Sequence, residues 1–297
     1  MLARCLPWIF MLCMGMLWGG SFSVAKIAIN AGGTPMGVAF WQAVIASALL
    51  LTYTLLRRRP MSLGVEQLRF YIVVGLMGIA IPGVCFYLAT PHLPAGILAI
   101  TVTLVPILTY CLALSLRLEQ ISWRRVTGII FGACAILLLV APESSLPNRS
   151  DVPWLLLACV SPLCLAAQNI LLARWHIAGL GPIRTACGMN LAAAVILLPV
   201  TAVNGDLFLP AFPFGTIEWG VVGLALIATI AYTMFVMTID RAGPLFASQV
   251  GYVVTLAGVF WGMLLFGESH SAWVWVSLAT MLAGLALVTP RKTGETG

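Results

Sequence analysis

Long apolar segments alternate with short polar breaks along the whole chain, and apolar residues cover every side of each segment. The segments fall at about residues 8–29, 35–56, 69–90, 95–118, 124–141, 152–173, 182–203, 216–239, 243–266 and 271–290. Each has about 18 to 24 residues, and a helix needs roughly 20 to cross the hydrocarbon of a membrane. Barrel strands would instead alternate apolar and polar residues over about ten positions. The pattern therefore predicts an all-α integral membrane protein with ten transmembrane helices.

Composition supports a chain that lives in lipid. Hydrophobic residues make up 61% of the 297 residues and charged residues only 8%, whereas a soluble domain has about 25% charged residues. The first segment also has features of a signal peptide, with Arg4 before an apolar core. Because nine further segments follow, we expect it to stay as an uncleaved first helix.

Basic residues predict the orientation. With the amino terminus inside, only Lys26 and Arg149 fall on the outer side. The cytoplasmic set is Arg4, Arg57, Arg58, Arg59, Arg69, Arg117, Arg124, Arg125, Arg174, Arg184, Arg241, Arg291 and Lys292. This asymmetry predicts a multi-pass protein of the bacterial inner membrane with both termini cytoplasmic. The net charge of +6 then reflects topology and contact with anionic lipid heads, so the lipid bilayer is an expected partner and nucleic acid is not.

The two halves align when the chain is shifted by about 148 to 150 residues. Glu119 then falls on Glu268, and Trp123 falls on Trp273. Further matches place Ala46, Leu49, Leu50, Ala135, Leu137, Leu139, Val140 and Pro142 on Ala194, Leu197, Leu198, Ala283, Leu285, Leu287, Val288 and Pro290. Since each half holds an odd number of helices, the second copy must enter the membrane from the opposite side. The alignment predicts two inverted five-helix repeats, residues 1–142 and 152–290, which form a single transport unit of the kind common in secondary transporters.

Several motifs give the chain a family resemblance. Trp18-Gly19 is followed by Lys26, Pro106 lies midway along the fourth segment, and Gly267-Glu268 closes the ninth. In this order, on a duplicated ten-helix plan, they resemble the EamA-type transporters of the drug/metabolite transporter superfamily over essentially the whole chain. The chain departs from the family at Gln42, where members often carry an arginine. The resemblance implies a carrier, often an exporter of amino acids or related small compounds, with no cofactor.

Polar residues within the spans are the candidates for substrate contact, because polar groups in hydrocarbon are costly unless they are paired or face water. They would enclose a central slot suited to a zwitterion or an amphipathic metabolite. The candidates are Trp18, Ser21, Tyr87, Thr101, Gln168, Asn169, Tyr232, Gln249 and Tyr252. A packing role stays open for each of them. For Gln42 and Asn190, which are equivalent in the alignment, hydrogen bonds between helices are the first interpretation.

Four charges at helix ends suggest gates. Lys26 and Glu268 are both predicted outside, and Arg174 and Glu119 mirror them inside. If the inverted symmetry brings each pair together, the outer pair would hold the inward-facing state and the inner pair the outward-facing state. The alternative is that the basic side chains extend to the lipid headgroups.

Local sequence features also predict how the helices bend and pack. Prolines within spans predict local breaks at Pro82, Pro106, Pro162 and Pro199. The small-residue pairs Gly15 with Gly19 and Gly128 with Gly132 permit close helix contact, either within one molecule or between two. A monomer and a homodimer therefore both remain open.

No catalytic group, metal ligand or cofactor is expected. The eight cysteines have neither Cys-x-x-Cys nor metal-ligand spacing, and His92, His176 and His270 are scattered. The sequence thus predicts a non-enzymatic secondary transporter or facilitator that exports a small organic metabolite by alternating access. A membrane-embedded enzyme and a non-transporting assembly or sensor protein are the alternatives. An enzyme would need clustered catalytic groups, whereas the carboxylates and histidines here are spread over both membrane faces.

Overall fold

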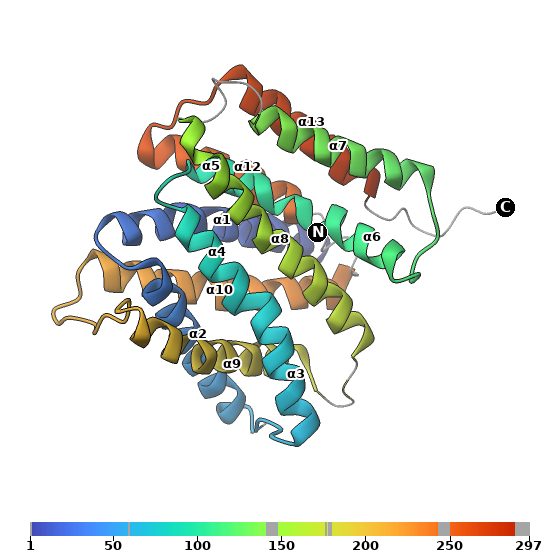
Figure 1. The fold of residues 1–297 in the computed structure, drawn as a ribbon. Helices are drawn as coiled ribbons and strands as arrows, with labels where there is room; N and C mark the ends of the chain where they lie inside the picture. The colour runs from blue at the N-terminus through green and yellow to red at the C-terminus, as the bar shows by residue number, and fades with distance from the viewer. Residues whose placement is uncertain are drawn as a thin grey trace.

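The computed structural model describes residues 2–58, 60–140, 148–175, 177, 180–242 and 250–288, and every regular element in these ranges is a helix. Figure 1 shows them as one bundle. The elements are α1 (Leu2–Asn30), α2 (Pro35–Leu56), α3 (Val65–Gly75), η1 (Leu76–Ala80), α4 (Ile81–Ala89), α5 (Ala95–Val102), α6 (Leu104–Ser115), α7 (Trp123–Val140), η2 (Arg149–Asp151), α8 (Val152–Arg174), α9 (Pro182–Val203), α10 (Thr216–Ala242), α12 (Val250–Phe266) and α13 (Ala272–Val288).

The helices have the length and surface of membrane spans. Among the described residues, 8 helical stretches are long and apolar enough to cross a bilayer, and they correspond to the first eight predicted segments. The last two predicted segments appear as the shorter apolar helices α12 and α13, each of 17 residues. Large apolar side chains such as Leu137, Val195 and Leu264 face outward, a surface that fits lipid and not water. The prediction of an all-α membrane protein is confirmed, while the count of ten spans stays a prediction.

Contacts between helices follow a regular scheme. Helix α1 packs against α10 and α12, whereas α8 packs against α4 and α6. The pairs α2–α9 and α7–α13 lie at opposite edges of the bundle in Figure 1. When each helix is replaced by its counterpart in the other predicted repeat, the contacts of α1 with α10 and α12 become those of α8 with α4 and α6. The pairs α2–α9 and α7–α13 each map onto themselves.

Two of the four prolines coincide with breaks. Pro82 follows the π-helical turn η1, and α5 ends and α6 begins around Thr103, just before Pro106. A proline lacks the N–H for the i−4 bond and crowds that carbonyl, so the preceding turn is loosened. Pro162 and Pro199 lie inside the continuous helices α8 and α9. Breaks are thus seen in the third and fourth predicted spans but not in the sixth and seventh.

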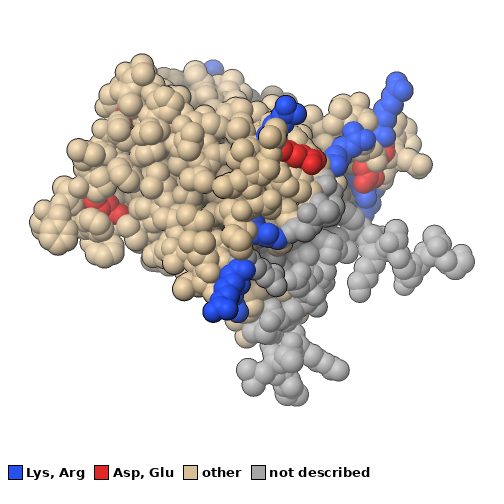
Figure 2. Space-filling model, turned by 90° about the horizontal axis from the view of Figure 1, so that it is seen from below, with Lys and Arg blue, Asp and Glu red and all other residues tan. Residues whose placement is uncertain are grey.

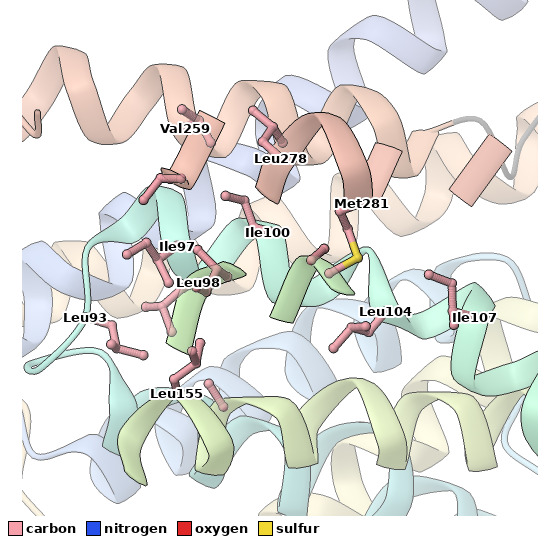
Figure 3. Packing of buried hydrophobic residues seen from close by; sticks show 14 of the residues in the cluster. Leu93, Ile97, Leu98, Ile100, Leu104, Ile107, Leu155, Val259, Leu278 and Met281 are labelled. Carbon is pink, nitrogen blue, oxygen red and sulfur yellow. The ribbon is translucent and has the colours of Figure 1, made fainter. Parts of the chain in front are cut away.

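A buried apolar core anchors α5. Leu93, Ile97, Leu98 and Ile100 pack with residues of α8, α12 and α13, including Met281, as Figure 3 shows. Every residue from Ala95 to Thr101 is buried. The amino-terminal end of α5 is therefore held in a fixed place. It lies at the end of the bundle that is at the left of Figure 1, which we call the distal end. The connecting segments at the distal end are 31–34, 90–94, 148–151, 204–215 and 267–271.

The small-residue pairs pack within one chain. A methyl group at Gly19 would lie 2.6 Å from the Cβ atom of Ala257 in α12, and one at Gly128 would lie 2.8 Å from the carbonyl oxygen of Gly284 in α13. These glycines therefore let α1 approach α12 and let α7 approach α13. Both glycines thus serve contacts inside the molecule, and the monomer and the homodimer both stay predictions.

We expect Gly128→Ala to destabilise the bundle. The added methyl group would lie 2.7 Å from Cγ2 of Val288, so α7 and α13 must separate, and overpacking of this kind costs about 1–3 kcal/mol. Thermal unfolding in detergent should show a Tm several degrees below that of the wild type. Gly181→Ala is the control, since a Cβ atom there meets no atom of the described residues within 4 Å. Equal losses of Tm in both variants would contradict the close contact at Gly128.

Candidate functional site

Glu268 lies at the centre of a polar contact at the distal end. Helix α12 ends at Phe266, and Gly267 adopts the left-handed conformation with φ 62° while its N–H donates to the Met263 carbonyl at 3.0 Å. A residue with a side chain adopts this conformation only at a cost. The turn brings Glu268 to α5, where its Oε1 accepts from the Ala95 N–H at 2.8 Å and its Oε2 accepts from the Gly96 N–H at 3.2 Å.

The first turn of α5 suits a carboxylate. The first N–H groups of a helix have no partner inside the helix, and the helix dipole is positive there. Gly262 provides room for the carboxylate, because a Cβ atom at this position would lie 2.5 Å from Glu268 Oε2. The Glu268 side chain is only 8% exposed. Its negative charge is therefore stabilised by backbone groups that the sequence motif did not reveal.

Lys26 supplies the opposite charge. Its Nζ atom lies 2.9 Å from Glu268 Oε1, donates to the Leu93 carbonyl at 3.3 Å and lies 5.1 Å from the centre of the Phe266 ring. The Lys26 side chain is 16% exposed, so it points into the protein and not toward the headgroups. The structure thus brings together the two charges that the sequence analysis placed at an outer gate.

The second pair of predicted gate charges does not meet. Glu119 forms its ion pair with Arg125, with Oε2 and Nη1 3.1 Å apart, and the Glu119 side chain is 49% exposed. Arg174 lies exposed in the last turn of α8. The Glu119–Arg174 contact is therefore absent from this conformation, because Arg125 in the first turn of α7 lies within reach of Glu119 across the short connection from α6.

One predicted slot residue takes part in a bond between helices. The Tyr87 hydroxyl in α4 donates to Oε1 of Gln42 in α2, and Tyr87 is buried. The expectation that Gln42 would bond to another helix is confirmed. The expectation for Asn190 is wrong, because its amide donates to the Ala186 carbonyl one turn earlier in its own helix at 2.8 Å.

Gln168 of α8 is different, since the contact that its amide makes is weak. Its Nε2 atom lies 3.8 Å from the Met189 sulfur, and the side chain is half-buried. The amide lies against Gly78 in the π-helical turn η1, where any Cβ atom would overlap it. Such turns are frequent at functional sites. The Gln168 amide therefore retains hydrogen-bonding capacity inside the bundle.

Other candidates bond to their own helix or line apolar clusters. The Ser21 hydroxyl donates to the Trp18 carbonyl at 2.6 Å, and the Thr101 hydroxyl donates to the Leu98 carbonyl at 2.7 Å. The Trp18 ring lies 5.8 Å from that of Phe235 in α10. The hydroxyls of Ser21 and Thr101 therefore bond within their own helices, and the indole ring of Trp18 packs against another aromatic ring.

The last candidates are spread over three helices. Asn169 is exposed and donates to the Thr109 hydroxyl at 3.3 Å, whereas the Tyr232 hydroxyl donates to the Pro182 carbonyl at 3.5 Å. Tyr252 is half-buried in α12. Gln249 lies outside the described residues. The bond from Ser21 to Trp18 joins two of the candidates within α1, and the bond from Tyr87 to Gln42 joins α4 to α2.

Phe86 is a residue that the sequence analysis missed. Its ring lies 5.3 Å from that of Phe22 in α1 and 5.7 Å from that of Tyr87, and it contacts three separate apolar clusters. A phenylalanine among many apolar residues gives no signal in the sequence. Its central position results from how α1, α4 and α5 pack.

Comparison with known proteins identifies the family. The model of the EamA-like transporter family matches residues 6–141 and again residues 152–289. The inner membrane transporter YedA of Escherichia coli K12, described as uncharacterized, is 27% identical over 281 residues, which are 93% of this chain and 88% of YedA. Protein PecM of Dickeya dadantii is 23% identical over 219 residues, which are 73% of this chain and 72% of PecM.

A solved crystal structure has the same fold. It aligns with a TM-score of 0.61 at 18% sequence identity and covers 97% of this chain and 96% of the solved one. The family resemblance seen in the motifs around Trp18, Lys26 and Glu268 is confirmed by the double match of the family model. The chain belongs to the EamA-like transporter family of the drug/metabolite transporter superfamily and is a membrane transporter.

Proposed function

We propose that this protein is a secondary transporter or facilitator that exports a small organic metabolite, an amino acid or a related compound, by alternating access. The observation that carries the proposal is the unequal state of its two related carboxylates. Glu268 is bound by α1 and α5, while Glu119 is exposed and pairs with nearby Arg125. The helices are therefore joined through Glu268 at the distal end, whereas the corresponding contact of Glu119 with Arg174 at the other end is not formed.

The helix contacts support an inverted repeat. The packing of α1 on α10 and α12 has its counterpart in the packing of α8 on α4 and α6. Two repeats that pack by the same scheme can exchange conformations, which closes one end of the molecule as the other end opens. The latched distal end then belongs to an inward-facing conformation.

The charge distribution supports the orientation that this assignment needs. In the view of Figure 2, most Lys and Arg side chains lie in the right half of the molecule. The distal end carries Lys26 and Arg149, and Lys26 is used in the ion pair with Glu268. A basic end faces the cytoplasm in membrane proteins of this kind, so the distal end is the outer one.

Gln168 is the polar group best placed for substrate in this scheme. Its amide lies on α8 between the η1 turn and α9, and among the described residues its hydrogen-bonding partner is the Met189 sulfur. An amide offers both a donor and an acceptor, which suits the polar end of an amino acid. Trp18 and Phe86, half-buried beside one apolar cluster, are in this proposal the rings that bind the rest of a small amphipathic molecule. The choice of amino acids and the export direction rest on the family resemblance.

We expect Gln168→Leu to weaken transport without unfolding the protein. In liposomes, a panel of amino acids, nucleosides, vitamins and polyamines should include a substrate with saturable flux. Loss of a neutral hydrogen bond to that substrate should raise KM by about tenfold, roughly 1.4 kcal/mol. Gln120→Leu is the matched control, since Gln120 is exposed in the connection before α7. If the folded protein shows saturable flux with none of the compounds, the metabolite-carrier proposal is wrong. If Gln168→Leu leaves KM unchanged, Gln168 is not part of the substrate site.

We also expect Lys26 and Glu268 to be energetically coupled. A cycle of Lys26→Met, Glu268→Gln and the double variant should give a coupling energy of about 1–3 kcal/mol in unfolding experiments. The exposed Glu119–Arg125 pair is the control and should give below about 1 kcal/mol. Charge removal is preferable to charge reversal, because a lysine at position 268 would face the Ala95 and Gly96 N–H groups. Equal coupling in the two pairs would contradict a special role for the distal contact.

A further inference from the structure

His270 is buried beside the Lys26–Glu268 pair. Its side chain is 2% exposed, and Nε2 lies 3.7 Å from Glu268 Oε2, beyond hydrogen-bond distance. Among the described residues, Nε2 has no hydrogen-bond partner. The ring lies in the segment between α12 and α13 and sits 6.3 Å from the Trp275 ring. A titratable side chain is thus enclosed where the distal contact closes.

The charges around this ring are already balanced. The described charged groups that act on it are Glu268 from its own segment and Lys26 from α1. The Glu268 carboxylate accepts from Lys26, from Ala95 and from Gly96. From α5 the ring meets the helix amino terminus, because a Cβ atom at Gly96 would lie 2.8 Å from Nε2, and from α13 it meets the neutral Trp275. A proton on His270 would therefore place a second buried cation beside Lys26 and near the positive end of α5, with Glu268 as the one carboxylate that the two cations share.

The expected direction of titration follows from these surroundings. Burial lowers the pKa of His270 below its ordinary value, the Glu268 carboxylate opposes this and the Lys26 ammonium adds to it. If the distal end opens, the ring meets water and its pKa returns toward the ordinary value of about 6.5. The open form is then the form that binds the proton more tightly, so protonation shifts molecules toward it.

We propose that His270 is a proton-binding site of this transporter, and that a proton taken up from the distal side releases Glu268 from α5 and opens the distal gate. The proposal rests on the alternating-access function proposed above and adds a ligand to it. Neutral His270 packs against Gly96 and permits closure. Protonated His270 disfavours the packed arrangement because its charge then lies beside the Lys26 ammonium and the positive end of α5, while the one nearby carboxylate, Glu268, is already paired with Lys26.

The pH range follows from the sign of this linkage. Above about pH 6.5, His270 is neutral in both forms and closure of the distal end is unopposed. As the pH falls below that value, the open form gains a proton before the closed form does. The ratio of open to closed molecules should rise by up to about tenfold for each unit that separates the two pKa values.

Spin-label distance measurements on the full chain in lipid nanodiscs test this without a known substrate. Labels at Ala31 and Leu156 in a background without the eight native cysteines report across the contact, because both positions are exposed, α1 carries Lys26, and α8 packs against α5. We expect a short distance at pH 8 and a growing longer component toward pH 5. His270→Gln should abolish the pH dependence. His92→Gln is the matched control, since His92 lies exposed at the same end and stacks on Trp154 with ring centres 3.9 Å apart; it should keep the pH dependence.

A third variant separates the proton site from the gate itself. Glu268→Gln removes the charge that binds Lys26 and should increase the longer component at both pH values. If it leaves the distances unchanged, the gate of the proposed function is wrong. If Glu268→Gln opens the distal end, the gate is supported. The proton site at His270 is then wrong if the wild type shows no pH dependence of the distances, or if His270→Gln keeps that pH dependence.

Discussion

A carboxylate that is almost fully enclosed in a membrane bundle must find its partners inside the protein, and Glu268 finds them on two other elements. The amino terminus of α5 supplies two N–H groups and α1 supplies the Lys26 ammonium. These contacts fix where α12 ends and how closely α1 approaches α5, and in the proposed cycle they hold the distal end closed. The glycines at positions 262 and 267 provide the space and the turn that the carboxylate needs.

The spans could be predicted because lipid imposes a simple requirement. Each crossing needs a long apolar helix, and this requirement is visible residue by residue. The predicted topology placed Lys26 and Glu268 at one end, so their pairing, which the structure shows, was one of the two alternatives that the sequence left open. The backbone partners of Glu268 could not be foreseen, because any residue supplies an N–H group and only the packing of α5 shows which ones lie free.

The candidate substrate site was predicted less completely for a related reason. Polar residues in the middle of a span are easy to find in an apolar sequence. The residue type, however, does not show which side chains already have their hydrogen bonds inside the protein. The Tyr87 hydroxyl is used by Gln42 and the Thr101 hydroxyl by its own helix, whereas Gln168 keeps a largely unused amide beside a π-helical turn. That turn results from Pro82 within the third span, and its contact with Gln168 depends on tertiary packing.

The unequal environments of Glu119 and Glu268 explain how a duplicated sequence can be adapted to alternating access in the proposed cycle. An exposed carboxylate keeps its hydration, so Glu119 can leave one partner for another at little cost. Glu268 at 8% exposure must regain water or a new partner before the distal end opens, because an unpaired buried charge is strongly unfavourable. The barrier to opening is therefore concentrated at this one side chain, and a change in the charge beside it, such as a proton on His270, acts where the conformational balance is most sensitive.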